Sequence, residues 1–215
     1  MVRKSGRRER REIDGDTAHL PQDHGPTLEG SGESHVLYRM PGHLIRRLQQ
    51  VAVSLFMEEV GSANITPVQY AALMAIKTYP RIDQASLAGV IAFDRATIGG
   101  VVDRLETKGL VRRATSPNDR RLRLLILEAK GEALLLRLAA SVGRAQERIL
   151  APLSAKEGRQ FMTLLTKLVV ENNERSRAPM RPVTHEKRLA AAQPRAADGA
   201  RVTSRTRRLR ASPVA

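Results

Sequence analysis

Apolar residues recur at steps of three and four through several segments between residues 36 and 175. This spacing places them on one side of an α-helix. Residues 36–61 are predicted to form one amphipathic helix, with Pro41 near its first turn and Gly61 at its end. Its apolar stripe consists of Leu37, Leu44, Leu48, Val51 and Leu55.

Two shorter helices follow. In "ITPVQYAALMAIKTYP", Thr66 is predicted to cap a helix that begins at Pro67 and is ended by Pro80. Its inward side is predicted to hold Val68, Ala71, Ala72 and Ala75. The segment "DQASLAGVIAF" predicts a third, short helix capped by Asp83.

A fourth helix is predicted in "DRATIGGVVDRLETKG", with Asp94 as its cap and Gly109 as its stop. Its buried stripe is predicted to be Ile98, Val101, Val102 and Leu105, which leaves Arg95, Ala96, Thr97, Gly99, Gly100 and Arg104 for the outer side. Small residues let a helix enter a major groove, while Arg and Thr can meet base edges and phosphates. The alternative is a plain surface helix, whose glycines cost about 1 kcal/mol each relative to Ala.

The third and fourth helices, joined by "FDRA", predict a helix-turn-helix with residues 94–108 in the recognition position. "LVRRAT" and "RLRLLILE" then predict two strands, with "SPNDRR" as the turn between them. A hairpin directly after a recognition helix is a wing, and Arg120 or Arg121 at its tip could enter a minor groove. A solvated surface hairpin is the alternative.

Two further helices are predicted in "EAKGEALLLRLAASVGRAQERILAPL" and "SAKEGRQFMTLLTKLVVENNERSR", the second opened by a capping box of Ser154 and Glu157. The first is lined by Leu135, Leu138, Val142 and Ile149, and the second by Phe161, Leu164, Leu165, Leu168 and Val169. The predicted fold is therefore mainly α with a small β-wing: a winged helix-turn-helix of six helices. The apolar stripes of the first and last two helices exceed what one small core absorbs, which indicates a helical dimer interface.

Charge narrows the possible partners. The chain has 37 Lys and Arg against 22 Asp and Glu, a net charge of +15, carried by residues 36–175 and 176–215. Such a balance favours a polyanionic partner, nucleic acid first and a membrane surface second. Residues 1–35 and 176–215 hold few apolar residues and are expected to be disordered tails.

Several classes of chemistry find no support in the sequence. The chain has no Cys, which excludes disulfides and thiolate metal sites. His19 and His24 lie five apart without further ligands nearby, and no nucleophile elbow, P-loop or dinucleotide fingerprint occurs. We expect no enzyme, cofactor or metal, and a cytoplasmic protein, since no apolar run approaches the roughly 20 residues of a membrane helix. A non-specific nucleoid-coating protein remains the competing interpretation.

The motifs "ITPVQ", "DRATIGGVVDRLETKGLVRR" and "SPNDRR" followed by "LEAKG" resemble the MarR family (multiple antibiotic resistance regulators), which are winged helix-turn-helix repressors. The resemblance covers about residues 36–175. Within it, "YRMPGHLIRRLQQ" is similar to members that control aromatic-acid catabolism of the nicotinate type. Ile65 departs from the usual Leu, and Glu128 stands where a Thr or Ser cap is usual.

The resemblance implies a homodimer that reads a pseudo-palindrome in double-stranded DNA, with residues 36–60 and 128–175 for dimerisation and 64–127 for DNA binding. It places the following residues at DNA: Arg95, Ala96, Thr97, Gly99, Gly100, Arg104, Asn118, Arg120 and Arg121. Asp119 matches a wing residue that bonds locally. Asp103 and Arg104 match a pair that contacts the wing or the phosphates; for Asp103 a surface ion pair is the alternative.

The resemblance also implies a pocket along the first helix. His43, Arg47 and Gln50 share one face of it, with Arg46 to the side. A guanidinium, an imidazole and an amide can clamp a carboxylate, while Tyr38, Tyr70 and Met74 offer apolar walls. The expected inducer is a small aromatic carboxylic acid such as a hydroxynicotinate. A solvated helix face is the alternative.

Overall fold

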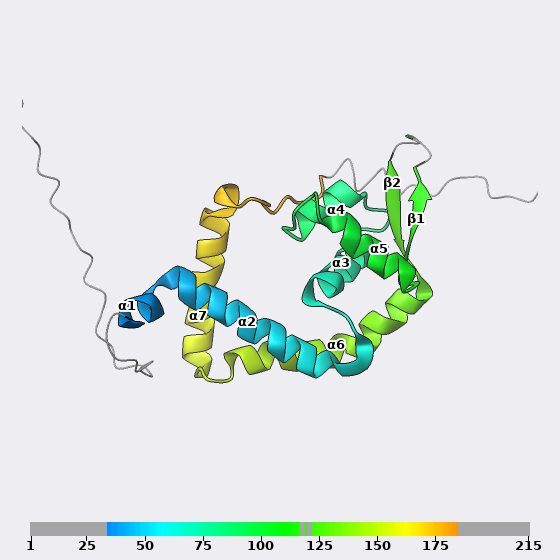
Figure 1. The fold of residues 1–215 in the computed structure, drawn as a ribbon. Helices are drawn as coiled ribbons and strands as arrows, with labels where there is room; N and C mark the ends of the chain where they lie inside the picture. The colour runs from blue at the N-terminus through cyan, green and yellow to red at the C-terminus, as the bar shows by residue number, and fades with distance from the viewer. Residues whose placement is uncertain (1–33, 117–118, 120–121, 185–215) are drawn as a thin grey trace, which may run out of the picture. The chain divides into compact units, whose positions relative to one another are not determined.

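The computed structural model describes residues 34–116, 119 and 122–184. The chain divides into two compact units, Met1–Arg47 and Leu48–Ala215. The described residues form seven α-helices and one antiparallel hairpin (Figure 1). The elements are α1 (Ser34–Arg39), α2 (Pro41–Val60), α3 (Pro67–Thr78), α4 (Gln84–Val90), α5 (Ile98–Thr107), β1 (Val111–Thr115), β2 (Arg123–Leu127), α6 (Ala129–Leu150) and α7 (Ala155–Glu171), with 3₁₀ turns at Gly61–Ala63 and Asn173–Arg175. Within these ranges no helix has the length and apolar character needed to cross a bilayer.

The predicted first helix is two helices, which is why the described chain has seven and not six. The chain leaves the α conformation at Met40, directly before Pro41. The proline ring clashes with the residue before it when that residue is helical, so Pro41 opens a new helix. The amides of His43 and Leu44 both donate to the Met40 carbonyl, at 3.0 and 3.1 Å, and start α2.

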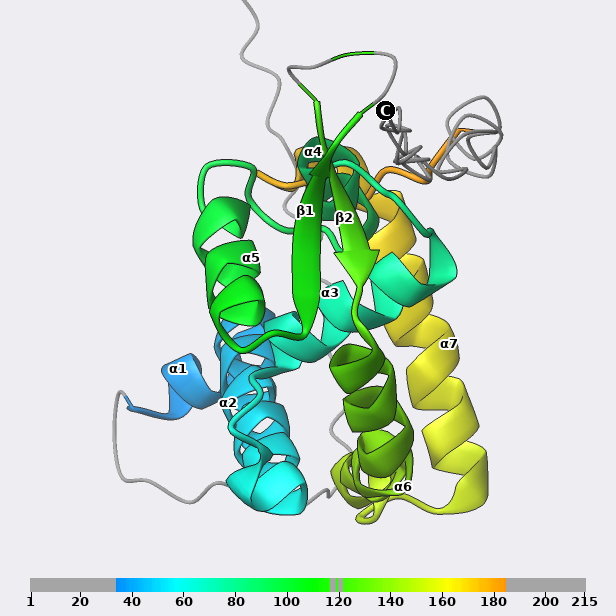
Figure 2. The ribbon, with the colours of Figure 1, turned by 90° about the vertical axis from the view of Figure 1, so that its right-hand side faces the viewer.

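The second unit is built around α3, which lies against α4, α5, α6 and β2 (Figure 2). The predicted Thr66 cap is confirmed and is part of a capping box with Gln69. Of the side chains predicted to face inward, Ala72 and Ala75 are buried, while Val68 and Ala71 are half-buried. Leu73 and Ile76 are fully buried as well, because a helix with neighbours on several sides buries more than one stripe.

The caps predicted for two further helices are also confirmed. The Asp83 carboxylate accepts the Ser86 amide at 2.9 Å and starts α4. Ser154 and Glu157 form the capping box of α7, and the hydrogen bonds from the Ser154 hydroxyl and amide lower the pKa of Glu157. Glu128 sits at the start of α6 without a side-chain capping bond and instead pairs with Arg112 at 2.7 Å.

Large apolar side chains remain exposed on α7. Leu164, Leu168 and Val169 are 53 %, 56 % and 58 % exposed, and Val170 and Met162 are exposed beside them. A stripe of this kind on one long helix marks a surface that another apolar surface can cover.

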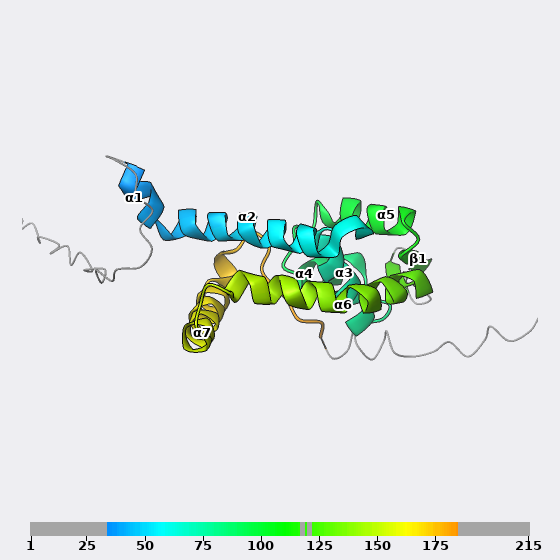
Figure 3. The same cartoon turned by 90° about the horizontal axis from the view of Figure 1, so that it is seen from below.

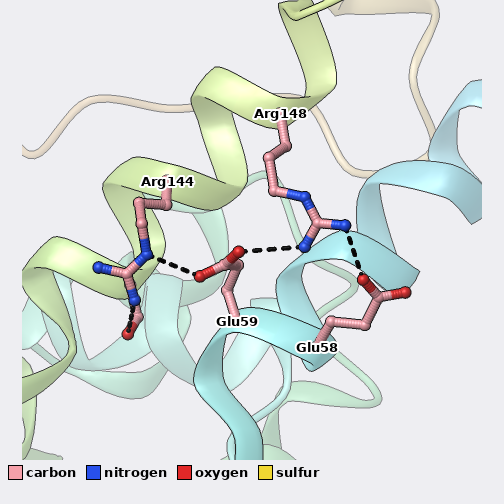
Figure 4. Close-up of polar contacts among 5 residues, drawn as sticks. Glu58, Glu59, Arg144 and Arg148 are labelled. Atoms are coloured by element: carbon pink, nitrogen blue, oxygen red, sulfur yellow. Dashed lines mark hydrogen bonds and ion pairs between the residues drawn. The ribbon is translucent and has the colours of Figure 1, made fainter.

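A cluster of ion pairs joins residues 48–60 of α2 to α6, where the two run side by side (Figures 3 and 4). Glu59 accepts from Arg144 Nε at 2.9 Å and from Arg148 Nη1 at 3.0 Å, while Arg148 Nη2 donates to Glu58 at 2.8 Å. The hydrogen bonds from Arg144, then those from Arg148, hold the pKa of Glu59 below its usual value.

This cluster predicts a pH dependence of stability. The pKa of Glu59 is lower in the folded state than in the unfolded state. Its contribution to the free energy of unfolding is therefore present above the ordinary pKa of a glutamate and is lost as the pH falls through the pKa of the folded state. At neutral pH we expect Glu59→Gln to unfold at a lower urea concentration than the wild type. The difference between the two unfolding midpoints should narrow below about pH 4.3. Urea titrations across pH measure it. Glu147→Gln, on α6 and without an ion pair in the described ranges, is the control; an equal gap for both substitutions would contradict the assignment.

Candidate nucleic-acid interface

Helix α5, predicted to be the recognition helix, begins at Ile98 with Thr97 at its N-cap, so the prediction that Asp94 caps it is wrong. The Asp94 carboxylate accepts the Ala96 amide at 2.8 Å, and its carbonyl accepts the amides of Thr97 and Ile98 at 3.2 and 3.0 Å. An Asp side chain bonded two residues ahead forms a turn of its own, and this competes with capping. Arg95, Ala96 and Thr97 therefore stand exposed in a turn at the N-terminal end of the helix.

The inner side of α5 is as predicted: Ile98, Val101, Val102 and Leu105 are all buried. Arg104 and Gly100 are exposed on the outer side, and Gly99 is half-buried. A Cβ added at Gly99 would lie 3.5 Å from Gln84 Nε2, while one at Gly100 would meet nothing within 4 Å. Packing within the described chain therefore gives no reason for a glycine at position 100.

The predicted stop of α5 at Gly109 is confirmed. Gly109 has φ of +68°, its amide donates to the Glu106 carbonyl at 2.8 Å, and the Leu110 amide donates to the Leu105 carbonyl at 3.0 Å. This pair of bonds is a Schellman motif, in which glycine takes the left-handed conformation at low cost. It turns the chain directly from α5 into β1.

The wing strands pair antiparallel, with Val111 opposite Leu127 and Thr115 opposite Arg123. The tip residues Asn118, Arg120 and Arg121 lie outside the described residues, so their proposed DNA contacts stay predictions. At Asp119, the backbone carbonyl accepts the Leu122 amide at 3.0 Å, a local bond within the turn.

Arg113, which the sequence interpretation missed, fixes the wing to α5. Its guanidinium donates to Asp103 at 2.6 Å and to Glu106, and its amide donates to Glu106 Oε1 at 3.0 Å. Partial burial lowers the pKa of Arg113, but the hydrogen bonds to Asp103 and Glu106 outweigh this and raise it overall. Asp103 thus contacts the wing, one of the two roles that the family resemblance implied. The signal available in the sequence was two carboxylates three apart on one helix face.

The comparisons with known proteins agree with this architecture. The model of the MarR family matches residues 65–122. The HTH-type transcriptional repressor NicR of Pseudomonas putida is 31 % identical over 128 residues, which cover 60 % of this chain and 81 % of NicR. The chain belongs to the MarR family.

Two solved structures support the same assignment. PcaV of Streptomyces coelicolor, in complex with its natural ligand, is 37 % identical, with a TM-score of 0.58 over 62 % of this chain and 94 % of PcaV. BpsR of Bordetella bronchiseptica, whose DNA binding is regulated by 6-hydroxynicotinic acid, is 27 % identical, with a TM-score of 0.58 over 60 % of this chain and 93 % of BpsR. This MarR-family chain is a transcriptional regulator with a winged helix-turn-helix fold and is not an enzyme.

The residues predicted to bind a ligand fall into both compact units of this MarR-family chain. In the first unit, the rings of Tyr38 and His43 meet edge to face, with centroids 5.7 Å apart. His43 Nε2 is buried and has no hydrogen-bond partner in the described ranges. Arg46 and Arg47 are exposed.

The remaining predicted ligand residues belong to the second unit. Tyr70 is half-buried and packs edge to face on Phe56, with centroids 5.9 Å apart. Gln50 and Met74 are exposed. Because these residues are divided between the two units, the proposed pocket stays a prediction.

Proposed function

We propose that this MarR-family regulator is a homodimeric repressor that binds a pseudo-palindromic operator and leaves it when a small aromatic acid binds. One observation carries the DNA-binding half of the proposal. The apolar side of α5 is buried and Arg113 ties the wing to the helix, while Arg95, Thr97 and Gly100 stay exposed at its N-terminal end. This is the end that helix-turn-helix proteins direct at base edges.

A dimer accounts for the exposed apolar face of α7. In this proposal residues 36–60 and 128–175 join two copies, and residues 64–127 of each read one half-site. Half-sites should then be about 10 bp apart, because each recognition helix enters a successive major groove on the same side of the duplex. Sedimentation of the full chain tests the assembly, and a monomer would contradict it.

The decisive experiment is a footprint on the promoter beside the regulator's own gene, followed by gel shifts with that site and with a scrambled duplex. A specific regulator should prefer its operator by about 10³ or more at physiological salt. The competing function is a non-specific nucleoid-associated protein, which the net charge of +15 favours. Equal binding to both duplexes would support that competitor.

The inducer is proposed on chemical grounds. The buried His43 Nε2 lacks a partner in the described ranges, and an unpaired buried polar atom is costly unless a ligand or water satisfies it. In the same unit, Arg46 and Arg47 can supply cationic donors to a carboxylate, and Tyr38 can supply an apolar wall for a ring. Ligand contacts of Gln50, Tyr70 and Met74 stay predictions. The effector of BpsR, 6-hydroxynicotinic acid, has both a carboxylate and an aromatic ring.

We expect an aromatic acid, 6-hydroxynicotinate among those tried, to release the operator, and His43→Ala and Arg47→Ala to raise the concentration needed. The acid shifts the equilibrium between the form that binds DNA and the form that does not. It can do so only by as much as its affinity for the second form exceeds its affinity for the first. Gel-shift titrations measure the release midpoint. Gln49→Ala, exposed on the same helix, is the control and should respond as the wild type does. Release that is undiminished in both test variants would rule out this pocket.

A further inference from the structure

The folded part of the chain continues past residue 175, where the tail was expected to begin, and its last described stretch is residues 172–184, here called the C-terminal segment. The segment holds its own shape through hydrogen bonds. The side-chain amide of Asn173 accepts the Met180 amide at 2.8 Å and donates to the Met180 carbonyl at 3.2 Å. Arg181 Nη2 donates to Glu174 at 2.7 Å, which closes the same loop a second time.

The C-terminal segment runs from the end of α7 to α4 (Figure 1). The Arg181 amide donates to the Gly89 carbonyl at 2.8 Å, and Val183 packs against the hydrophobic core. A Cβ added at Gly89 would lie 3.1 Å from Arg181 Cβ, so a glycine allows this close approach. The segment is therefore docked on the helix-turn-helix and not merely adjacent to it.

Docking brings positive charge to the start of α5. Arg177 Nη2 lies 3.1 Å from the carboxylate of Asp94, the residue whose bonds form the turn before α5. The Arg177 side chain is 85 % exposed, and an ion pair so open to solvent holds weakly. Arg175 ends the 3₁₀ turn two residues before Arg177. Arg175 and Arg95 are exposed and make no ion pair within the described ranges. Residues 185–215, which lie outside the described residues, contain eight Lys and Arg against two acidic residues.

We propose that the C-terminal segment is a second DNA-contact element, in which Arg175 and Arg177 bind backbone phosphates beside the groove that α5 enters. The proposal rests on the DNA binding proposed above. Phosphates line both edges of a groove at about one charge per 1.7 Å of duplex, and guanidinium binds phosphate better than it holds an exposed carboxylate. Such contacts add affinity and orientation but no base preference.

The test compares the full-length wild type with the double substitution Arg175→Ala and Arg177→Ala. The slope of log affinity against log salt should become shallower by about 2, one for each lost phosphate contact. Between about 50 and 200 mM salt the wild type should therefore lose about 10-fold more affinity than the variant. Operator and scrambled duplex should be affected alike. The control removes the same charge elsewhere, with Arg137→Ala and Lys156→Ala at exposed positions of α6 and α7. It should sediment as the wild type does and keep the wild-type slope.

Asn173→Ala tests whether the position of the C-terminal segment matters apart from its charge. The variant keeps every Lys and Arg but loses both hydrogen bonds between Asn173 and Met180. We expect a shallower salt slope for it as well, with an unchanged melting temperature as evidence that the rest of the fold is intact. The proposal is overturned if the arginine double variant keeps the wild-type salt slope or if the slope of the control falls by as much. It is also overturned if Asn173→Ala keeps the wild-type slope, or if the arginine double variant binds DNA more tightly than the wild type. Failure of the proposed function is a different result: the wild type would not prefer the operator, while the slopes on scrambled DNA would still decide the role of this segment.

Discussion

Arg95→Ala is expected to weaken operator binding by about 1–3 kcal/mol and to relax the preference for the base pair that Arg95 reads. Arg95 is exposed in the turn that precedes α5 and has no ion pair in the described ranges, so its guanidinium is available to a base edge. The loss should be larger for the operator than for a scrambled duplex, because a base contact contributes only where the matching base is present. Gel shifts with operators altered one base pair at a time measure both quantities.

Arg95→Lys is the matched control for charge. Lysine keeps the cation but not the planar fork that pairs with two acceptors of one base. We therefore expect Arg95→Lys to retain most of the affinity for scrambled DNA and to lose part of the preference among operators. If Arg95→Ala leaves both affinity and preference unchanged, residue 95 does not contact the groove.

Gly131→Ala is expected to destabilise the fold by about 1–3 kcal/mol, as overpacking of a tightly filled site does. Gly131 is buried in the first turn of α6, where the Leu110 backbone carbonyl at the base of the wing and the Leu127 side chain lie against it. A Cβ there would clash with that carbonyl and would lie 2.7 Å from Leu127 Cδ1. Backbone cannot rotate away as a flexible side chain can, so the wing or α6 must shift.

Gly143→Ala on the same helix is expected to stabilise the fold. A Cβ at Gly143 would meet nothing within 4 Å, and alanine is favoured over glycine inside a helix by about 0.5–1 kcal/mol. Urea unfolding of the two variants beside the wild type measures the contrast. Equal effects at positions 131 and 143 would contradict the close approach of the wing to α6.

Much of the local structure followed from the sequence because neighbouring residues determine it. The caps at Thr66, Asp83 and Ser154 and the stop at Gly109 rest on bonds between groups at most five residues apart. The buried stripe of α5 followed from the 3.6-residue period alone. The break before Pro41 is equally local, and its signal was present in the sequence.

Tertiary structure decided what depends on groups that are distant along the chain or that compete for one partner. The Asp94 side chain could cap a helix or form a turn. In the folded chain its carboxylate accepts the Ala96 amide in a turn and forms an ion pair with Arg177. Residues 172–184 have too few apolar side chains to predict order, yet they dock because Gly89 leaves room for Arg181. In the sequence, nothing distinguishes Arg113 from the other cations of a basic chain. The hairpin brings its guanidinium to the carboxylates of Asp103 and Glu106. Periodicity reveals which face a helix buries, and capping residues reveal where the helix begins and ends. The partner of each charge depends on which segments the core brings together.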